Sequence, residues 1–397
     1  MAPFDLPKRL VGRRELRLNL DVMSATIGFG TPVRVGRMTP VAVWGTGNMG
    51  AAAIRSALAF PGLELTAVIT STPDKANRDA AEFAGLAAPT GVAVSLDVGA
   101  ALLGCDAVAY MASGDIRPDE AVTDIERCLR AGKHVVTPSL YSLYDPRSAP
   151  AEWIDRMTAA AREGGAALLV SGVDPGWAND ALAVAAAGLC TRIRTIRCQE
   201  IFDYSTYDQP YAVKVSCGFG GSMDDTPMML LPTIPTMVWG GNIRLIGRGL
   251  GLEIDEITEE VERLPLEESV DTVMGRFEKG TQGAFFLRVI GWSGGRQRVV
   301  VEHVTRIHAS VAPHWPQPDE GVGDHRVIVD GDPQLTIVTR ADVPGGTRAD
   351  GGNTTAANRL LGAISWLAAR EPGIYDGLDV PLHPALPAEV EATRWLD

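Results

Sequence analysis

The sequence has few cysteines, few basic residues and no long hydrophobic run, and each shortage excludes a class of protein. Of its 397 residues only five are cysteine, and no two of them form a C-x-x-C pair. An odd number of scattered thiols is typical of a reducing compartment, so we expect a cytoplasmic protein. No run approaches the roughly 18 apolar residues that a membrane-spanning helix needs. The net charge of −13 would repel the phosphates of nucleic acids and of anionic membranes, so neither is an expected partner.

The first 38 residues differ in composition from the rest of the chain. They mix basic and acidic side chains without a long apolar stretch, so they do not resemble a secretory signal. We expect residues 1–38 to be a poorly ordered N-terminal extension or the product of a mis-assigned start. No function is predicted for them.

A glycine-rich turn at residues 45–50 is the most informative feature. An apolar strand at 41–44 precedes it and a helical pattern at 51–60 follows, which is the context that a dinucleotide-binding fingerprint requires. The three glycines permit the tight turn, the approach of a pyrophosphate and the close packing of helix on strand. Free N–H groups at the helix start then bind the phosphates. The predicted cofactor-binding residues here are Gly45, Thr46, Gly47, Asn48, Met49 and Gly50.

Strands and helices alternate over residues 41–170. This alternation predicts right-handed βαβ crossovers, and therefore a doubly wound parallel sheet of the Rossmann type. The predicted strands are 41–44, 63–69, 92–95, 106–111, 134–137 and 166–170, and the predicted helices are 51–60, 79–86, 119–131 and 151–163.

The pattern changes after residue 172, where longer polar segments separate the strands. This change predicts a second, α+β domain with a mixed sheet. We therefore expect an α/β domain over 39–171, a second domain over 172–350, and a C-terminal helix and tail over 351–397 that return to the first domain. The strands predicted in the second domain are 193–202, 285–290, 298–307 and 334–338, and 253–264 is predicted as a helix.

The end of the second predicted strand, residues 63–69, favours NADP over NAD. Many NAD-binding domains place an acidic residue there to bind the ribose 2′-hydroxyl. This chain has Ser71, Thr72 and Lys75 instead, whose hydroxyl and ammonium groups suit a 2′-phosphate. The nearby Asp74 adds a like charge, so NAD stays possible.

Small residues follow two further strands, and ligands of open α/β sheets bind at such carboxyl ends. Because small side chains let a ring approach the backbone, we expect the nicotinamide to lie there. The residues predicted to contact it are Met111, Ala112, Ser113, Thr137, Pro138 and Ser139.

A second distinctive turn, residues 171–180, joins a buried strand to a helix. A Gly/Pro turn before a helix start is a suitable site for a polar substrate group. It is equally compatible with a plain helix start that Asn179 or Asp180 caps.

Three motifs in this order resemble the 2,4-diaminopentanoate dehydrogenase and native amine dehydrogenase family, whose fold is similar to that of dihydrodipicolinate reductase. They are the glycine turn at 45–50, Ala-Gly-Lys-His-Val-Val-Thr at 131–137 and Gly-Val-Asp-Pro-Gly at 172–176. The closing segment at 371–381 is also similar, and the resemblance covers residues 39–382. It implies a homodimer in which NAD(P)H reduces an imine formed from a ketone and ammonia, or in which an amine is oxidatively deaminated.

The chain departs from the family pattern in the residues near the nicotinamide. Relatives with demonstrated amine chemistry carry a Glu just after the strand that ends at Thr137, and this chain has none there. Relatives tend to have Asn where this chain has Asp174. Because reductive amination needs a carboxylate near the reacting carbon, we hypothesise that Asp174 supplies it. Tyr141 is a candidate proton donor or substrate ligand, or else a pocket wall.

Two further residues are candidates for the substrate pocket. Trp177 lies inside the Asp174 turn, where its bulk would limit substrate size, and Glu302 lies on a predicted strand, where a salt bridge is the competing role. No metal site is predicted, because His303 and His308 point to opposite faces of a regular strand.

Two alternatives to an amine dehydrogenase remain open at the level of sequence. One is a dehydrogenase or reductase that acts on a carbonyl or cyclic imine without ammonia, which the missing Glu favours. The other is a non-catalytic nucleotide-binding regulator, because the same fold serves both enzymes and binding modules.

Overall fold

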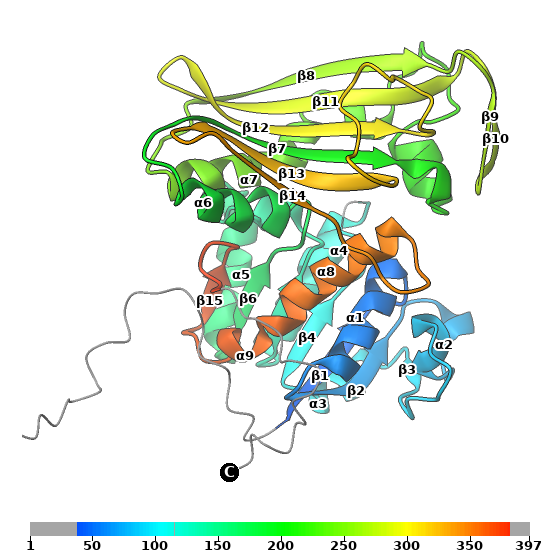
Figure 1. Ribbon diagram of the computed structural model, residues 1–397. Helices are drawn as coiled ribbons and strands as arrows, with labels where there is room; N and C mark the ends of the chain where they lie inside the picture. Colours follow the sequence, from blue (N-terminus) through cyan, green and yellow to red (C-terminus); the bar gives the residue numbers. More distant parts are fainter. Residues whose placement is uncertain (1–37, 115, 382–397) are drawn as a thin grey trace, which may run out of the picture.

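The computed structural model describes residues 38–114 and 116–381, and these residues form two large sheets (Figure 1). The first sheet is parallel throughout, in the order β15-β6-β5-β4-β1-β2-β3, which confirms the predicted doubly wound fold. Its strands are β1 (Thr39–Trp44), β2 (Leu63–Ile69), β3 (Val94–Ser95), β4 (Ala107–Tyr110), β5 (His134–Thr137), β6 (Ala167–Val170) and β15 (Gly373–Tyr375).

Helices cover both faces of this sheet, which explains why its strands are continuous apolar runs. One face packs against α1 (Asn48–Ala59), α2 (Ala80–Ala84), α8 (Arg348–Gly362) and α9 (Ile364–Leu367). The other face packs against α3 (Val98–Leu103), α4 (Pro118–Arg130) and α5 (Ala151–Gly164). Two short 3-10 helices, η1 (Pro73–Lys75) and η2 (Tyr141–Leu143), follow β2 and β5.

The C-terminal segment returns to the first sheet. The hydroxyl of Ser56 on α1 donates to the side-chain oxygen of Asn358 on α8 at 2.7 Å, and β15 pairs in parallel with β6. The single C-terminal helix expected within residues 351–397 is replaced by two helices, α8 and α9, that meet at Ala363. In the described part of the chain, no helix has both the length and the apolar character needed to cross a membrane.

The second sheet is mixed, in the order β14-β13-β7-β12-β11-β8, with β12 parallel to β7 and the other pairs antiparallel. This agrees with the predicted α+β domain. Its strands are β7 (Ile193–Asp203), β8 (Glu256–Pro265), β11 (Gln282–Ser293), β12 (Arg296–Arg306), β13 (Gly323–Gly331) and β14 (Leu335–Thr339), and β9 (Val270–Thr272) pairs separately with β10 (Gly275–Phe277).

Two helices, α6 (Ala181–Ala187) and α7 (Ile234–Gly249), lie between the second sheet and the first domain (Figure 1). They cover the inner face of the sheet, and their apolar side chains join its core. The remaining short helices are η3 (Trp177–Asn179), η4 (Tyr204–Thr206), η5 (Tyr211–Ser216) and η6 (Met228–Leu230).

The prediction of a helix at 253–264 was wrong, because this segment forms β8. Its apolar residues Ile254, Ile257, Val261 and Leu264 have helical spacing, but the segment pairs along its length with β11. Tertiary pairing has overridden the local pattern, as is common for strands.

Asp180 fixes the start of α6 at the junction of the two domains. Its fully buried carboxylate accepts the N–H of Ala181 and lies 3.5 Å from the amide nitrogen of Asn242 on α7. Burial raises the pKa of Asp180 to about 6, although the Ala181 N–H and the charge of Arg359 act in the opposite direction. The folded protein therefore binds a proton at this site more tightly than the unfolded chain does.

We expect Asp180 to make stability fall as the pH rises from about 4 to about 6. The raised pKa favours the protonated carboxyl in the folded state, so its stabilising contribution is complete below the unfolded pKa and is lost as the pH passes the folded value. Asp180→Asn keeps a capping side chain without the charge. Urea titrations from pH 4 to 7 should show wild type losing about 3 kcal/mol relative to this variant. The exposed Asp155→Asn is the control, and parallel pH profiles for wild type and Asp180→Asn would contradict the assignment.

Candidate active site

The glycines between β1 and α1 fit a bound pyrophosphate. Gly45 has a φ of +127°, and a Cβ there would lie 2.9 Å from the carbonyl carbon of Met111. A Cβ on Gly50 would overlap the carbonyl oxygen of Gly45, so glycine is needed for α1 to approach β1. A Cβ on Gly47 would meet no protein atom within 4 Å, and this residue has an ordinary φ of −84°. Packing does not require glycine at 47, whereas a phosphate at the start of α1 does.

The residues predicted to select NADP lie beside this turn. Lys75 donates from Nζ to the hydroxyl of Thr46 at 3.1 Å, so its ammonium group lies over the glycine turn. Ser71 and Thr72 are exposed between β2 and Lys75, and Asp74 is exposed next to them. Hydroxyls and one ammonium group therefore border the open end of the turn.

Hydrogen bonds join the ends of β4, β5 and β6 into one edge. Ser139 donates from Oγ to the carbonyl of Ala112 at 2.6 Å, and the N–H of Ser171 donates to the carbonyl of Thr137 at 3.1 Å. The strand order reverses between β1 and β4, where ligands bind in open α/β sheets. The structure brings together at this edge the predicted nicotinamide residues Met111, Ala112, Ser113, Thr137, Pro138 and Ser139.

Asp174 lies in the turn after β6, and its side chain is only 4% exposed. Its Oδ1 accepts from the amide nitrogen of Asn179 at 2.7 Å and from the indole nitrogen of Trp239 on α7 at 2.8 Å. Asp180 caps α6, and Gly176 occupies the capping position of η3. Asp174 is therefore not a helix cap, and its carboxylate faces the second domain.

Three strands of the second sheet present a row of ionisable side chains to this carboxylate. Glu200 on β7 is the register partner of both His303 on β12 and His325 on β13. Its carboxylate oxygens lie 3.5 Å from Nδ1 of His303 and 3.4 Å from Nε2 of His325. The Nε2 atoms of His303 and His325 lie 3.6 and 3.8 Å from Asp174. Two acids and two histidines thus share one largely buried site.

The pKa shifts in this cluster reflect competition between burial and charge. Burial raises the pKa of Asp174, and the charges of the histidines only partly oppose it. Burial also disfavours the ionised form of Glu200, but the two histidines outweigh it and lower its pKa. Burial alone would lower the pKa of His303 and of His325, but the two carboxylates raise both. The cluster therefore favours an ionised Glu200 and protonated histidines, and Asp174 binds a proton more tightly than an exposed carboxylate would.

Aromatic rings surround the cluster. The centroid of the Trp239 ring lies 4.0 Å from that of His303, and Phe202 lies 6.4 Å from His325. The ring of Tyr204 lies 5.8 Å from Phe202. These rings limit the access of water, and their faces suit a cationic or apolar substrate group.

Tyr141 and Trp177 both belong to segments next to Asp174. Tyr141 is half-buried and packs against the cores of both domains. Its ring lies 6.3 Å from that of Tyr144, whose hydroxyl donates to the carbonyl of Ser171 at 3.0 Å. Trp177 is half-buried and begins η3, which packs against β7 and β13.

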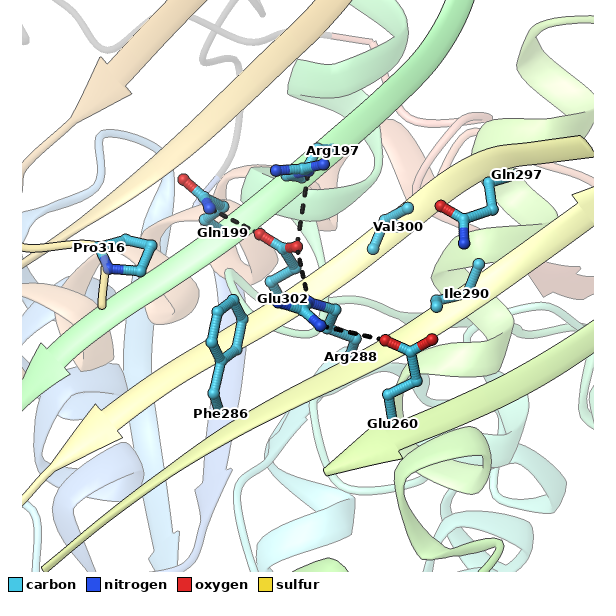
Figure 2. Close-up of a pocket in the computed structure, with 10 residues that line it drawn as sticks. All are labelled: Arg197, Gln199, Glu260, Phe286, Arg288, Ile290, Gln297, Val300, Glu302 and Pro316. Carbon is cyan, nitrogen blue, oxygen red and sulfur yellow. Dashed lines mark hydrogen bonds and ion pairs between the residues drawn. The ribbon is translucent and has the colours of Figure 1, made fainter. Parts of the chain in front are cut away.

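Glu302 lies on the other face of the second sheet. It is adjacent to His303 on β12, so the two side chains point in opposite directions. Glu302 is 2% exposed and pairs with Arg197 at 3.5 Å and Arg288 at 3.4 Å (Figure 2). These residues line a cavity of about 360 Å³ on the outer face. The structure therefore does not bring Glu302 together with Asp174.

Sequence analysis did not single out Glu200, His325 or Trp239. Glu200 had a recognisable signal, because in a regular strand it shares a face with the apolar Ile196, Cys198 and Phe202, a costly position for an acid without a partner. His325 lies on β13 and Trp239 on α7, and neither element was predicted.

The same cluster has donor types that a divalent cation accepts. Among the described residues, Asp174, Glu200 and His303 place potential donor atoms within 4.8 Å of one another. The expectation of no metal considered His303 only together with His308 and not with these acids.

Comparison with known proteins identifies the family. Residues 177–394 match the family described as the 2,4-diaminopentanoate dehydrogenase C-terminal domain. An amine dehydrogenase from Streptomyces virginiae is 53% identical over 352 residues, which are 88% of this chain and 98% of the relative. A 2,4-diaminopentanoate dehydrogenase from Acetoanaerobium sticklandii is 23% identical over 239 residues, 59% of this chain and 62% of that enzyme.

Solved structures support the fold. The amine dehydrogenase from Mycobacterium smegmatis superimposes with a TM-score of 0.69 at 19% identity, covering 91% of this chain and 99% of that one. A probable dehydrogenase from Thermotoga maritima gives a TM-score of 0.53 at 18% identity, covering 86% and 92% of the two chains. Together with the 53% identical relative, which matches over both domains, these findings establish the assignment. The chain belongs to the amine dehydrogenase family, whose members are NAD(P)-dependent oxidoreductases that act on amine donors.

Proposed function

We propose that the protein converts a ketone or aldehyde and ammonia into a primary amine, and catalyses the reverse deamination, with NADP(H) preferred over NAD(H). The observation that carries this proposal is the buried carboxylate of Asp174. It lies at the carboxyl edge of the first sheet, between the predicted nicotinamide residues and the histidines of the second domain. A carboxylate in that position suits ammonia and a developing iminium charge.

The cofactor, when bound, supplies or accepts the hydride, and the protein supplies binding, orientation and proton transfer. The turn at 45–50 would hold the pyrophosphate, with Thr46, Asn48 and Met49 around the start of α1. The linked ends of β4 and β5 would hold the nicotinamide, because Ser139 and Ala112 keep both ends rigid.

Asp174 would act on the substrate in two ways. Its carboxyl orients ammonia and donates a proton as the carbon–oxygen bond breaks, and the carboxylate that remains stabilises the charge of the iminium. Asn179 and Trp239 both donate to Oδ1 and so fix the orientation of the carboxylate. Trp177 and Tyr141 would form walls of the substrate pocket, with the hydroxyl of Tyr141 as a further proton donor.

The preference for NADP follows from the position of Lys75. Its ammonium group reaches back to Thr46 across the turn, where a 2′-phosphate would attract it. The proposed cytoplasmic location is supported by five cysteines that are all unpaired. The proposed homodimer is supported by the family resemblance alone.

Gly47→Ala and Gly50→Ala separate cofactor contact from packing. A Cβ at 47 meets no protein atom, so Gly47→Ala should leave the melting temperature of the free enzyme unchanged and raise the Kd for NADPH at least 10-fold. A Cβ at 50 overlaps Gly45, so Gly50→Ala should lower the melting temperature. Calorimetry and fluorescence titration measure both effects. Unchanged NADPH affinity in Gly47→Ala would refute the proposed phosphate site.

Lys75→Ala tests the cofactor preference. Loss of one charge-assisted contact should raise the Kd for NADPH about 10-fold, which corresponds to about 1.4 kcal/mol, with little effect on NADH. Lys279→Ala, an exposed residue of the second domain, is the control. Equal losses for both coenzymes would show that Lys75 does not read the 2′-phosphate.

Asp174→Asn tests the proposed reaction. Wild type should oxidise NADPH with a panel of ketones only when ammonium is present, and the variant should lose at least 100-fold in kcat while its NADPH affinity stays the same. The amide keeps a hydrogen-bonding side chain of the same size, so the loss reports on charge and proton transfer. Turnover without ammonium would instead indicate a carbonyl reductase, and undiminished kcat in Asp174→Asn would exclude Asp174 from the mechanism.

A further inference from the structure

A row of three ionisable side chains lies next to Asp174, namely those of His325, Glu200 and His303. Starting from Nε2 of His325, successive gaps are 3.4 Å to Glu200, 3.5 Å from Glu200 to His303, and 3.6 Å from His303 to Asp174. The side chains of His325 and Glu200 are each 16% exposed, whereas those of His303 and Asp174 are 6% and 4% exposed, and Nε2 of His325 also lies 3.8 Å from Asp174 itself. The row therefore leads from two partly exposed side chains to the most buried carboxylate, which both histidines approach.

We propose that His325, Glu200 and His303 form a proton relay that exchanges protons between solvent and Asp174 during amine formation. This inference rests on the proposed function of Asp174 and adds three residues to which sequence analysis gave no role in catalysis. The strand register fixes the geometry, since Glu200 faces one histidine on each side. The gaps exceed ordinary hydrogen-bond lengths, and catalytic contacts commonly shorten only when substrate is bound.

The histidine nitrogen atoms that face Asp174 are available for proton exchange, as a relay requires. Nε2 of His303 and Nε2 of His325 are both buried and have no hydrogen-bond partner within the described residues. Buried polar atoms without partners are rare and call for an explanation. Proton exchange with Asp174 and a bound amine provides one.

Amine formation requires a supply of protons to Asp174. Ammonia attacks the carbonyl carbon and forms the new carbon–nitrogen bond, and a proton moves from nitrogen to oxygen. The carbon–oxygen bond then breaks, and water leaves with one additional proton taken from Asp174, which gives the iminium. Hydride transfer to carbon yields the neutral amine. The net reaction consumes one proton for each ketone, ammonia and reduced coenzyme, so Asp174 must be reprotonated once per cycle.

The charged groups around the row are consistent with this role. From neighbouring elements, and beyond the effect of burial, the charge of Glu200 raises the pKa of Tyr204, the charge of Asp174 raises the pKa values of Tyr144 and Asp180, and Glu302 on the opposite face of the sheet raises the pKa of His303. The negative charge of Glu200 stabilises the protonated form of either histidine, so a transferred proton can reside on His325 or on His303.

Glu200→Gln removes the charge in the middle of the row while keeping its size. We expect kcat to fall at least 10-fold at pH 8, where external protons are scarce, and less at pH 6, with the ketone KM and the NADPH Kd changed less than 2-fold. His325→Ala should regain activity with added imidazole, because its side chain is more exposed than that of His303. Controls are Glu260→Gln and His308→Asn, on β8 and in the loop after β12, which should behave as wild type.

A second measurement does not depend on turnover. In protein labelled with ¹³C at histidine Cε1, two imidazole resonances should titrate at lower pH in Glu200→Gln than in wild type. Identical titrations, or a wild-type rate and pH profile in Glu200→Gln, would overturn the relay. Stoichiometric metal in the purified enzyme, or inactivation by a chelator, would overturn it in favour of a metal centre. Failure of the proposed function is distinguishable, because wild type itself would then show no ammonium-dependent turnover.

Discussion

The burial of the Asp174 carboxylate is the constraint on which the arrangement of the two domains depends. Removing a carboxylate from water costs several kcal/mol unless donors and countercharges replace the water. Here Asn179 from the same turn, Trp239 from α7 and the histidines of β12 and β13 provide that replacement. The turn after β6, one helix and two strands must converge for this carboxylate to be tolerated, so the proposed active site and the domain junction are stabilised by the same contacts.

The second sheet has two faces with different chemistry on the same strands. Successive side chains on β12 point to opposite faces of the sheet. His303 therefore points inward to Asp174, and Glu302 points outward to Arg197 and Arg288. The inner face is enclosed by α6 and α7, so its ionisable groups influence one another strongly. On the outer face Glu302 is itself buried, so the partly exposed Arg197 and Arg288 supply the countercharge that its carboxylate needs there.

Local features of the site could be predicted from sequence, whereas features that depend on pairing between distant strands could not. The glycine turn and the Asp174 turn each lie within ten residues, and their residue types already specify a phosphate site and a polar turn. Glu200 and His303 meet only because β7 and β12 pair in one register across about a hundred residues. That register follows from the packing of whole strands. His325 could not be recognised, because the start of β13 is too rich in polar residues to read as a strand.

The path of the chain has a consequence for its synthesis. The first core includes Leu360, Leu361 and Ile364 from the C-terminal helices, and β15 supplies the outer neighbour of β6. When residue 340 has been synthesised, the β6 edge of the parallel sheet therefore still lacks its neighbour β15, and one apolar face is covered by α1 and α2 but not yet by α8 and α9. Such edges and faces favour aggregation. The nascent chain must keep its N-terminal domain from associating with other molecules until the last helices emerge, so the first domain completes its folding only after the second domain has been synthesised.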